Sequence, residues 1–335
     1  MKIRVIEDIN TIDKDSFNCF QEQHPNGNFF QSLEAFTYFA SVDKYKPLII
    51  VATEGEEVVG SLLAIIMKEK NKIKGFLSRR CIIYNGPVIK NDDAEITLQL
   101  LQYFDKIIAK RVIYAEFRAF FDMELYKGVF HNSGYKFEEH LNYIVPVTTI
   151  EENKKLLNTS KRRQLHLSLK NGTVITEPES LADIKSFYSI LSELYKNKVK
   201  KPLPEFDFFE KFYNNKKLGK YFLVKYENKI IGGIMCPIDK NKIYEWFICG
   251  LDGQYKNFYP SVLATWAPIE FAANNGIKYF DFLGAGKPNM DYGVREFKSK
   301  FGGELVNYGR FVKIYNKQLY SFGKLGLEII GKIRK

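Results

Sequence analysis

The hydrophobic pattern of the chain repeats once, at an offset of about 172 residues, as from residue 66 to residue 238. Residues 48–66 (LIIVATEGEEVVGSLLAII) and 221–238 (YFLVKYENKIIGGIMCPI) each contain two apolar runs around a polar turn. Each pair is followed by the same further elements: a third strand (near 74–84 and 242–250), a helix (93–110 and 260–275) and another strand (112–118 and 278–283). Self-similarity over half the chain indicates a duplicated α/β unit.

The short turns between consecutive strands predict antiparallel meanders, because parallel strands need long crossovers. Glu54-Gly55 and Glu227-Asn228 have the composition of turns. Helices are expected before each meander, at 29–42 and at 160–171, 181–197 and 205–214. In the helix at 160–171 we expect Ser160 to be the N-cap and Gly172 to end the helix.

This order of helices, meander, helix and further strands is that of a GNAT acyltransferase domain. We therefore predict an α/β (α+β) fold of two tandem GNAT-like domains, each a mixed, mainly antiparallel sheet flanked by helices. Pro146 and the polar run 151–155 mark the boundary, so domain 1 spans 1–146 and domain 2 spans 147–315. Residues 316–335 are expected to form a basic amphipathic helix, which either packs on a domain or lies on a membrane surface.

Composition and charge narrow the class of protein. At 335 residues, with 45% hydrophobic and 27% charged residues, the chain is globular and long enough for two cores. MKIRVIEDIN has no apolar signal region, and no apolar run reaches the ~20 residues of a membrane span, so a cytoplasmic protein is expected. The net charge of +11 favours anionic partners, namely nucleic acid, nucleotide-linked substrates or an anionic membrane face.

Five short segments of the second half carry motifs of a known family. They are SKRRQ (160–164), KNG (170–172), DFLGA (281–285), GVREFK (293–298) and FGGE (301–304). Weaker marks in the first half are FQS (30–32) and NGPV (85–88). With these motifs the chain resembles the Fem family of peptidoglycan-bridge aminoacyltransferases. Segment 115–142 is closer to a related branch of acetyltransferases.

The resemblance implies two GNAT-fold domains, with the C-terminal helix at 316–335 returning to pack on domain 1. It implies transfer of an amino acid from aminoacyl-tRNA to an amine of a nucleotide- or lipid-linked peptidoglycan precursor. The family's lysine falls on Lys298.

The loop at 249–260 bears on the donor. GNAT enzymes bind the pyrophosphate of acetyl-CoA with a Q/R-x-x-G-x-G/A loop, whose small residues let phosphate approach the backbone. Counted from Gln254, these positions hold Asn257 and Tyr259, so CoA is disfavoured and no cofactor is expected. A tRNA end would instead meet Lys161, Arg162, Arg163 and the run 196–201, although such clusters also occur as solvated faces.

Four residues of the second half are candidates for the chemistry. Lys298 is the first choice as a catalytic residue, since a cation stabilises an oxyanion or leaving group, and Arg295 on the same helical face would bind the same anion. Asp281 precedes a Gly-rich loop, where it either takes part in catalysis or caps the turn. Glu245, mid-strand beside Trp246, is either a general base with a raised pKa or an outward-facing carboxylate.

Further side chains are expected to bind substrate. Tyr255 and Tyr292 would line a cleft or pack at its rim, Lys198 would contact an anion, and Arg118 would bind substrate or pair with Glu116. The four histidines and four cysteines lack ligand spacing, so we expect no metal. No Ser-His-Asp or Cys-His order stands out, which favours direct attack by the acceptor amine.

The sequence thus predicts an aminoacyl-tRNA-dependent N-acyltransferase acting on an envelope precursor. We expect a monomer in the cytoplasm, with contact to the inner membrane face left open. Two alternatives remain: an acyl-CoA-dependent N-acyltransferase acting on an amino sugar or amino acid, and a non-catalytic tandem-GNAT binding protein.

Overall fold

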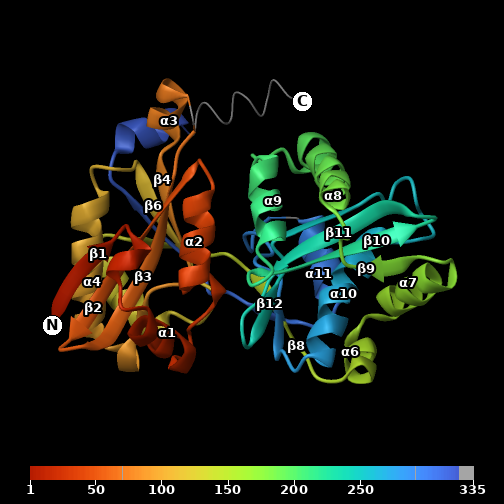
Figure 1. The fold of residues 1–335 in the computed structure, drawn as a ribbon, viewed down its shortest axis with the longest axis horizontal. Helices are drawn as coiled ribbons and strands as arrows, with labels where there is room; N and C mark the ends of the chain where they lie inside the picture. Colours follow the sequence, from red (N-terminus) through yellow and green to blue (C-terminus); the bar gives the residue numbers. More distant parts are fainter. Residues whose placement is uncertain (70, 291, 324–335) are drawn as a thin grey trace. The chain divides into compact units, whose positions relative to one another are not determined.

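The computed structural model describes residues 1–69, 71–290 and 292–323 (Figure 1). The chain forms two compact units. Unit 1 contains Met1–Glu139 and returns at Tyr308, and unit 2 is His140–Asn307. Each unit has its own hydrophobic core.

Unit 1 is built on one sheet, of eight strands within the described residues, in the order β1-β2-β3-β4-β6-β16-β7 with β5 beside β3. The strands are β1 (Lys2–Ile6), β2 (Tyr45–Glu54), β3 (Glu57–Met67), β4 (Arg80–Tyr84), β5 (Val88–Ile89), β6 (Tyr114–Arg118), β7 (Lys136–Glu138) and β16 (Arg310–Ile314). As expected, β2 and β3 pair antiparallel, and Gly55 takes the positive φ of +61° that their turn requires. The strands β4 and β6 are parallel.

Unit 1 also contains helices and short 3₁₀ turns. The helices are α1 (Lys14–Gln23), α2 (Leu33–Ser41), α3 (Lys72–Ser78), α4 (Ala94–Ile108) and α5 (Lys127–Asn132), with 3₁₀ turns at Ile9–Thr11, Phe29–Gln31, Lys90–Asp92 and Glu124–Tyr126. In α4 the buried residues Leu100, Leu101, Phe104 and Ile108 follow helical spacing, and the Asp93 side chain caps the first turn.

The described residues of unit 2 form two four-stranded sheets, β13-β11-β10-β9 and β12-β14-β8-β15. Their strands are β8 (Asn142–Pro146), β9 (Val174–Thr176), β10 (Gly219–Tyr226), β11 (Lys229–Pro237), β12 (Lys242–Tyr244), β13 (Phe247–Gly250), β14 (Tyr279–Asp281) and β15 (Glu304–Val306). The meander pair β10 and β11 is antiparallel, and Glu227 and Asn228 both have positive φ in the turn between them.

The helices of unit 2 are α6 (Ile150–Leu156), α7 (Thr159–Lys170), α8 (Leu181–Leu194), α9 (Phe206–Asn214), α10 (Pro260–Asn274) and α11 (Gly293–Ser299), with a π-helical turn at Tyr195–Val199. Helix α10 is buried on most of its sides, and its own buried residues include Leu263, Trp266 and Ile269. Such a helix belongs inside a core, and α10 contacts β10, β11, β13 and α7. No described helix is long and apolar enough to cross a bilayer.

The structure places the unit boundaries differently from the predicted limits of 1–146 and 147–315. Strand β8 belongs to unit 2, because it pairs with β14 and β15. Strand β16 belongs to unit 1, because it pairs with β6 and β7. In the C-terminal segment 316–335, residues 317–323 are helical and are grouped with unit 1, and the rest of this predicted helix lies outside the described residues.

Several predicted elements need correction. The expected strand at 74–84 begins only at Arg80, after α3. The helix expected at 29–42 is a 3₁₀ turn followed by α2, since the Ser32 side chain accepts from the Ala35 amide and caps α2. The N-cap of α7 is Asn158, whose side chain accepts from the Ser160 amide, and not Ser160 itself. Gly172 follows α7 with a φ of +88°, as a helix end requires.

The strand expected at 242–250 is broken at Glu245 and Trp246, and this break shapes the site. The Glu245 amide donates to the carbonyl of Asp281, in the sheet of β12 and β14. The next amide, of Trp246, donates to the carbonyl of Met235 on β11, in the other sheet. The chain therefore crosses from one sheet to the other within two residues.

Candidate functional site

A cavity of about 430 Å³ lies in unit 2 beside this crossing. It is lined by the end of α8, β13, the start of α10, and α7 and α11. Its charged and polar lining residues are Lys161, Gln164, Lys198, Glu245, Asp252, Ser261 and Lys298. We call this space the unit 2 cavity.

The wall of the unit 2 cavity contains a buried ion pair. The ammonium of Lys298 lies 2.9 Å from Oε1 of Glu245, and the two side chains are only 9% and 5% exposed. Burial raises the pKa of Glu245 above its ordinary value, and the Lys298 charge opposes that rise. The other oxygen, Oε2, is buried without a hydrogen-bond partner among the described residues. Because a buried carboxylate oxygen is costly to leave unpaired, Glu245 has capacity for one more donor.

Lys298 also fixes the loop after β14. Besides Glu245, its Nζ donates to the carbonyls of Phe282 and Gly284, both at 2.8 Å. These three bonds use all three N–H groups of the ammonium. In this arrangement Lys298 orients Glu245 and the loop at 282–284 and has no N–H left for a substrate.

Asp281 holds the same loop from the other side. Its Oδ1 accepts from the Asn142 side chain at 2.7 Å and from the Leu283 amide at 2.8 Å, while Asn142 accepts from the Gly284 amide. The loop needs this support, since Leu283 has a φ of +54°, a strained value for a branched residue. Burial raises the pKa of Asp281. The structure shows the turn-capping alternative for Asp281.

Lys161 is a largely buried cation on another wall of the cavity. Its Nζ lies 4.1 Å from the centre of the Phe297 ring and donates to the Gln164 side chain at 3.0 Å. Burial, with repulsion from Lys300, lowers its pKa. No carboxylate pairs with it within 4 Å in the described parts of the chain. The site therefore presents a cation that an anion could neutralise.

The N-terminus of α10 borders the cavity but is occupied by the protein's own carboxylate. Asp252 Oδ1 accepts from the Ser261 amide at 3.3 Å, and Oδ2 accepts from the Ser261 hydroxyl. Tyr259, just before the helix, has a φ of +44° and lines the cavity. A Cβ on Gly250 would lie 2.4 Å from Ser261 Oγ, so the Asp252–Ser261 cap packs directly on this glycine.

The other predicted residues lie outside the cavity wall, except Lys198. Arg295 donates to the carbonyls of Ala285, Lys287 and Pro288, so its guanidinium binds the chain's own backbone. Tyr292 packs over Gly286, and Tyr255 packs with Tyr226 and Phe258.

On α7, Arg162 donates to the Leu157 carbonyl, and Arg163 is exposed. Arg118 lies in unit 1, where its Nε donates to Glu116 at 2.7 Å, so the predicted pairing is present. The roles predicted for these residues in binding stay predictions.

Sequence reasoning did not find Asn142, Asp252, Ser261 or Phe297. Asn142 is 139 positions from its partner Asp281, and no local pattern marks it. Asp252 lies in the loop at 249–260 and Ser261 directly follows it, and an acidic residue so near a helix start is a signal for a cap. Within the described residues, no group of three His, Cys, Asp or Glu side chains could hold a metal.

Comparisons with solved structures support the fold. The crystal structure of FemX superposes with a TM-score of 0.74 at 16% identity, covering 96% of this chain and 99% of that one. L-PGS from Bacillus licheniformis gives 0.59 at 14% identity (95% and 97% covered), and a tandem GNAT protein from the clavulanic acid pathway gives 0.55 at 7% (94% and 99%). The predicted fold of two tandem GNAT-like domains is confirmed.

Sequence comparisons show a likeness to known proteins over part of the chain. The aminoacyltransferase FemA of Staphylococcus aureus is 32% identical over 81 residues, which is 23% of this chain and 19% of FemA. The matched region thus spans about a fifth of the length of the curated relatives. The model of the FemAB family matches residues 214–325, which include Glu245, Asp281 and Lys298. The likeness to the FemAB family therefore covers residues 214–325, about a third of the chain.

Proposed function

We propose that the chain is an N-acyltransferase that moves an amino acid from aminoacyl-tRNA to an amine of a peptidoglycan precursor. The observation that carries the proposal is the Glu245–Lys298 pair, which lies in the family match and leaves one carboxylate oxygen unpartnered at the unit 2 cavity. Amide formation needs a proton acceptor for the attacking amine, and a buried carboxylate with a raised pKa has that capacity.

In the proposed reaction, the acceptor ammonium gives one proton to Glu245 and becomes a neutral amine. The amine nitrogen attacks the ester carbonyl and forms the new C–N bond. The ester C–O bond breaks as a second proton passes from the nitrogen to the leaving ribose oxygen, and Glu245 then gives the first proton to solvent. Lys298 is in this scheme a positioning residue, which fixes the direction of Glu245 through Oε1 and keeps Oε2 for the substrate.

Two features of the unit 2 cavity support tRNA over CoA as the donor. The Asp252 carboxylate accepts from the amide and the hydroxyl of Ser261 at the start of α10, so the pyrophosphate of CoA would have to displace a like charge. Lys161, in contrast, pairs with no carboxylate of the described residues and lies over the Phe297 ring. A cation next to an aromatic ring suits a phosphate and an unpaired base of the tRNA end.

The acceptor would be the nucleotide- or lipid-linked precursor, and the protein would act in the cytoplasm or at the inner membrane face. The net charge of +11 suits both polyanionic substrates.

The test is incubation of the full chain with a panel of charged tRNAs, a panel of acyl-CoAs and envelope precursors, followed by mass spectrometry of the precursor. The expected product gains the mass of one aminoacyl residue with a charged tRNA and nothing with acyl-CoA. Glu245→Gln should lower the transfer rate at least 100-fold, in keeping with loss of a general base. Glu296→Gln is the matched control, because this exposed carboxylate also pairs with a lysine.

Saturable CoA binding with acyl transfer and no effect of RNA would instead assign the acyl-CoA alternative. Absence of transfer with every donor would favour the non-catalytic alternative.

A further inference from the structure

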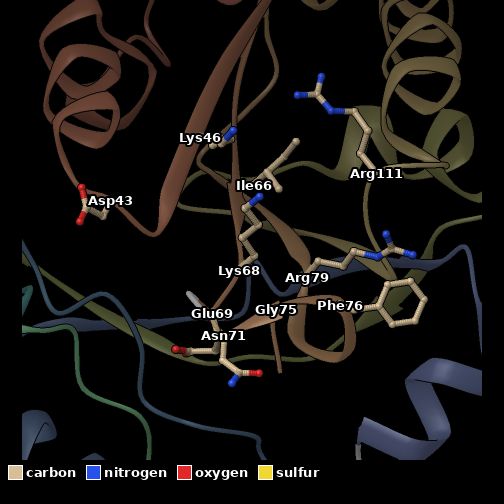
Figure 2. Close-up of a pocket in the computed structure, with 10 residues that line it drawn as sticks. All are labelled: Asp43, Lys46, Ile66, Lys68, Glu69, Asn71, Gly75, Phe76, Arg79 and Arg111. Carbon is tan, nitrogen blue, oxygen red and sulfur yellow. The ribbon is translucent and has the colours of Figure 1, made fainter. Parts of the chain in front are cut away.

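Unit 1 contains a second cavity, of about 540 Å³, which the proposed reaction does not use. It lies where β2 begins, β3 ends and β4 and β6 begin, and α3 forms one side (Figure 2). We call it the unit 1 cavity. Its charged lining residues are Asp43, Lys46, Lys68, Glu69, Arg79 and Arg111.

The lining of this cavity is basic, with four cations against two carboxylates, and one of the cations, Arg111, pairs with Glu7 outside the lining. Of the two acids, Glu69 forms an ion pair with Lys44, a residue outside the lining, with 2.7 Å between Nζ and Oε2. Arg79 is the cation most in need of a partner. Its Nε is buried without a hydrogen-bond partner in the described structure, and its guanidinium carbon lies 4.3 Å from the centre of the Phe76 ring (Figure 2). A guanidinium fork of this kind binds phosphate through two parallel hydrogen bonds.

The rim of the unit 1 cavity is apolar and exposed. Phe76 and Leu77, both on α3, are 49% and 43% exposed. The helical residues 317–323 lie next to α3, since a Cβ on Gly323 would be 3.7 Å from the Leu77 carbonyl, and this segment adds Phe322 at 69% exposure (Figure 1). Exposed apolar side chains that gather in one place mark an interaction surface.

We propose that the unit 1 cavity and its rim dock the protein on an anionic phospholipid bilayer. A lipid phosphate lies between Arg79, Lys46 and Lys68, while Phe76 and Leu77 enter the interfacial layer. Basic side chains gain free energy from the negative surface potential of such a membrane, and aromatic and leucine side chains bury apolar area at the headgroup boundary. A soluble phosphate would explain the cations but not the exposed Phe76, Leu77 and Phe322.

This inference does not rest on the proposed acyl transfer, and binding can be measured without any substrate. It also differs from the predicted role of the C-terminal helix, because the residues that carry it belong to α3 and the strand ends around it.

The test is co-sedimentation of the full chain with vesicles of phosphatidylglycerol and phosphatidylcholine, or of phosphatidylcholine alone. Binding should require phosphatidylglycerol and weaken as salt is raised. The variant Lys68→Gln/Arg79→Gln should bind at least about tenfold more weakly, given the attraction per basic residue near an anionic surface. Phe76→Ser/Leu77→Ser should bind several-fold more weakly.

Matched controls come from the same unit. Lys14→Gln/Lys136→Gln removes two exposed charges that do not line the cavity, and Leu125→Ser removes an apolar side chain that is 74% exposed. Both should bind within twofold of the unmodified chain. In Phe76→Trp, tryptophan emission should shift to the blue when phosphatidylglycerol vesicles are added.

Equal binding by all variants, or no emission shift in Phe76→Trp, overturns the proposal. The proposal is also overturned if inorganic pyrophosphate fully displaces the protein from the vesicles, a result that would assign the cavity to a soluble anion. Displacement by RNA that depends on Lys68 and Arg79 but not on Phe76 and Leu77 would assign it to nucleic acid.

Discussion

Replacing Lys298 by methionine tests the central pair of the unit 2 cavity. Methionine keeps most of the aliphatic stem and removes the ammonium. The change leaves the Glu245 carboxylate, 5% exposed, without its cation, and leaves the carbonyls of Phe282 and Gly284 without a donor.

The expected loss of unfolding free energy is large. Removing one partner of a buried ion pair costs about 3–5 kcal/mol, and each carbonyl left without its donor adds to the loss. For a unit of this size, 1 kcal/mol corresponds to about 2–4 °C in melting temperature, so a fall of about 10 °C is expected. The double variant Glu245→Gln/Lys298→Met should recover much of the loss, because it buries no unpaired charge.

The sequence offers a selective probe for this measurement. Its two tryptophans, Trp246 and Trp266, both lie in unit 2, so intrinsic fluorescence during urea unfolding reports on that unit. The surface lysine Lys300, which pairs with the exposed Glu296, supplies the control. Lys300→Met should cost at most about 1 kcal/mol, the upper range for an exposed pair.

The effect should also depend on pH with a defined sign. Glu245 has a folded-state pKa above its unfolded value, so the folded state holds its proton more tightly. Its contribution to stability is therefore greatest below the unfolded pKa and falls as pH rises toward the folded pKa. Without Lys298 this window extends upward, and the loss in Lys298→Met should be greater at pH 8 than at pH 5. A loss below about 1 kcal/mol, or no recovery in the double variant, would refute the assignment of a buried, charged pair.

Three further predictions concern the surroundings of the cavity. Asp281→Asn should make the unfolding free energy of unit 2 fall less steeply with rising pH, since it removes a second buried carboxyl with a raised pKa. An unchanged slope of unfolding free energy against pH, measured by fluorescence, contradicts this. Gly250→Ala should lower the unfolding free energy by about 2 kcal/mol or more, because the new Cβ clashes with Ser261. The control Gly253→Ala should change it by less than about 0.5 kcal/mol, because no atom lies within 4 Å of the new Cβ. Lys161→Met should leave stability unchanged or raise it, because burial disfavours this charge; it should weaken tRNA binding and reduce its salt dependence, and a retained salt slope in a titration contradicts the phosphate contact.

The repeated meander was predictable because its signals are local. Alternation, turn residues and helical spacing predict β2, β3, β10 and β11, as well as α4, without reference to the rest of the chain. The boundaries of the units were not predictable in this way. Strand β16 joins unit 1 because it pairs with β6 and β7, which lie more than 170 positions earlier. The apolar pattern of a strand does not indicate which strand it pairs with.

The site was predictable in part, for the same reason. The motif GVREFK located Lys298 in a short helix. The three partners of Lys298 lie elsewhere: two are carbonyls of the loop after β14, and the third is the carboxylate of Glu245. KIYEWFICG (242–250) has the pattern of one continuous strand. It breaks at Glu245 because the amides of Glu245 and Trp246 bond to different sheets, and those bonds exist only in the folded unit. Burial of Glu245 follows from that break, as does its place at the cavity.

The kinetic consequence of Lys298→Met separates two roles for Glu245. If Oε2 takes the proton of the attacking amine, the ionised carboxylate is required, so kcat rises with pH through the pKa of Glu245 in the substrate complex. Removing Lys298 takes away a charge that opposes the rise in that pKa, and the rising limb of kcat should move to higher pH. If Oε2 instead binds the ammonium of the transferred amino acid, the same substitution should raise KM and leave the pH profile of kcat in place. If Lys298→Met changes neither KM nor the pH profile of kcat, Glu245 does not titrate in the reaction. The buried pair would then serve only to hold the loop at 282–284.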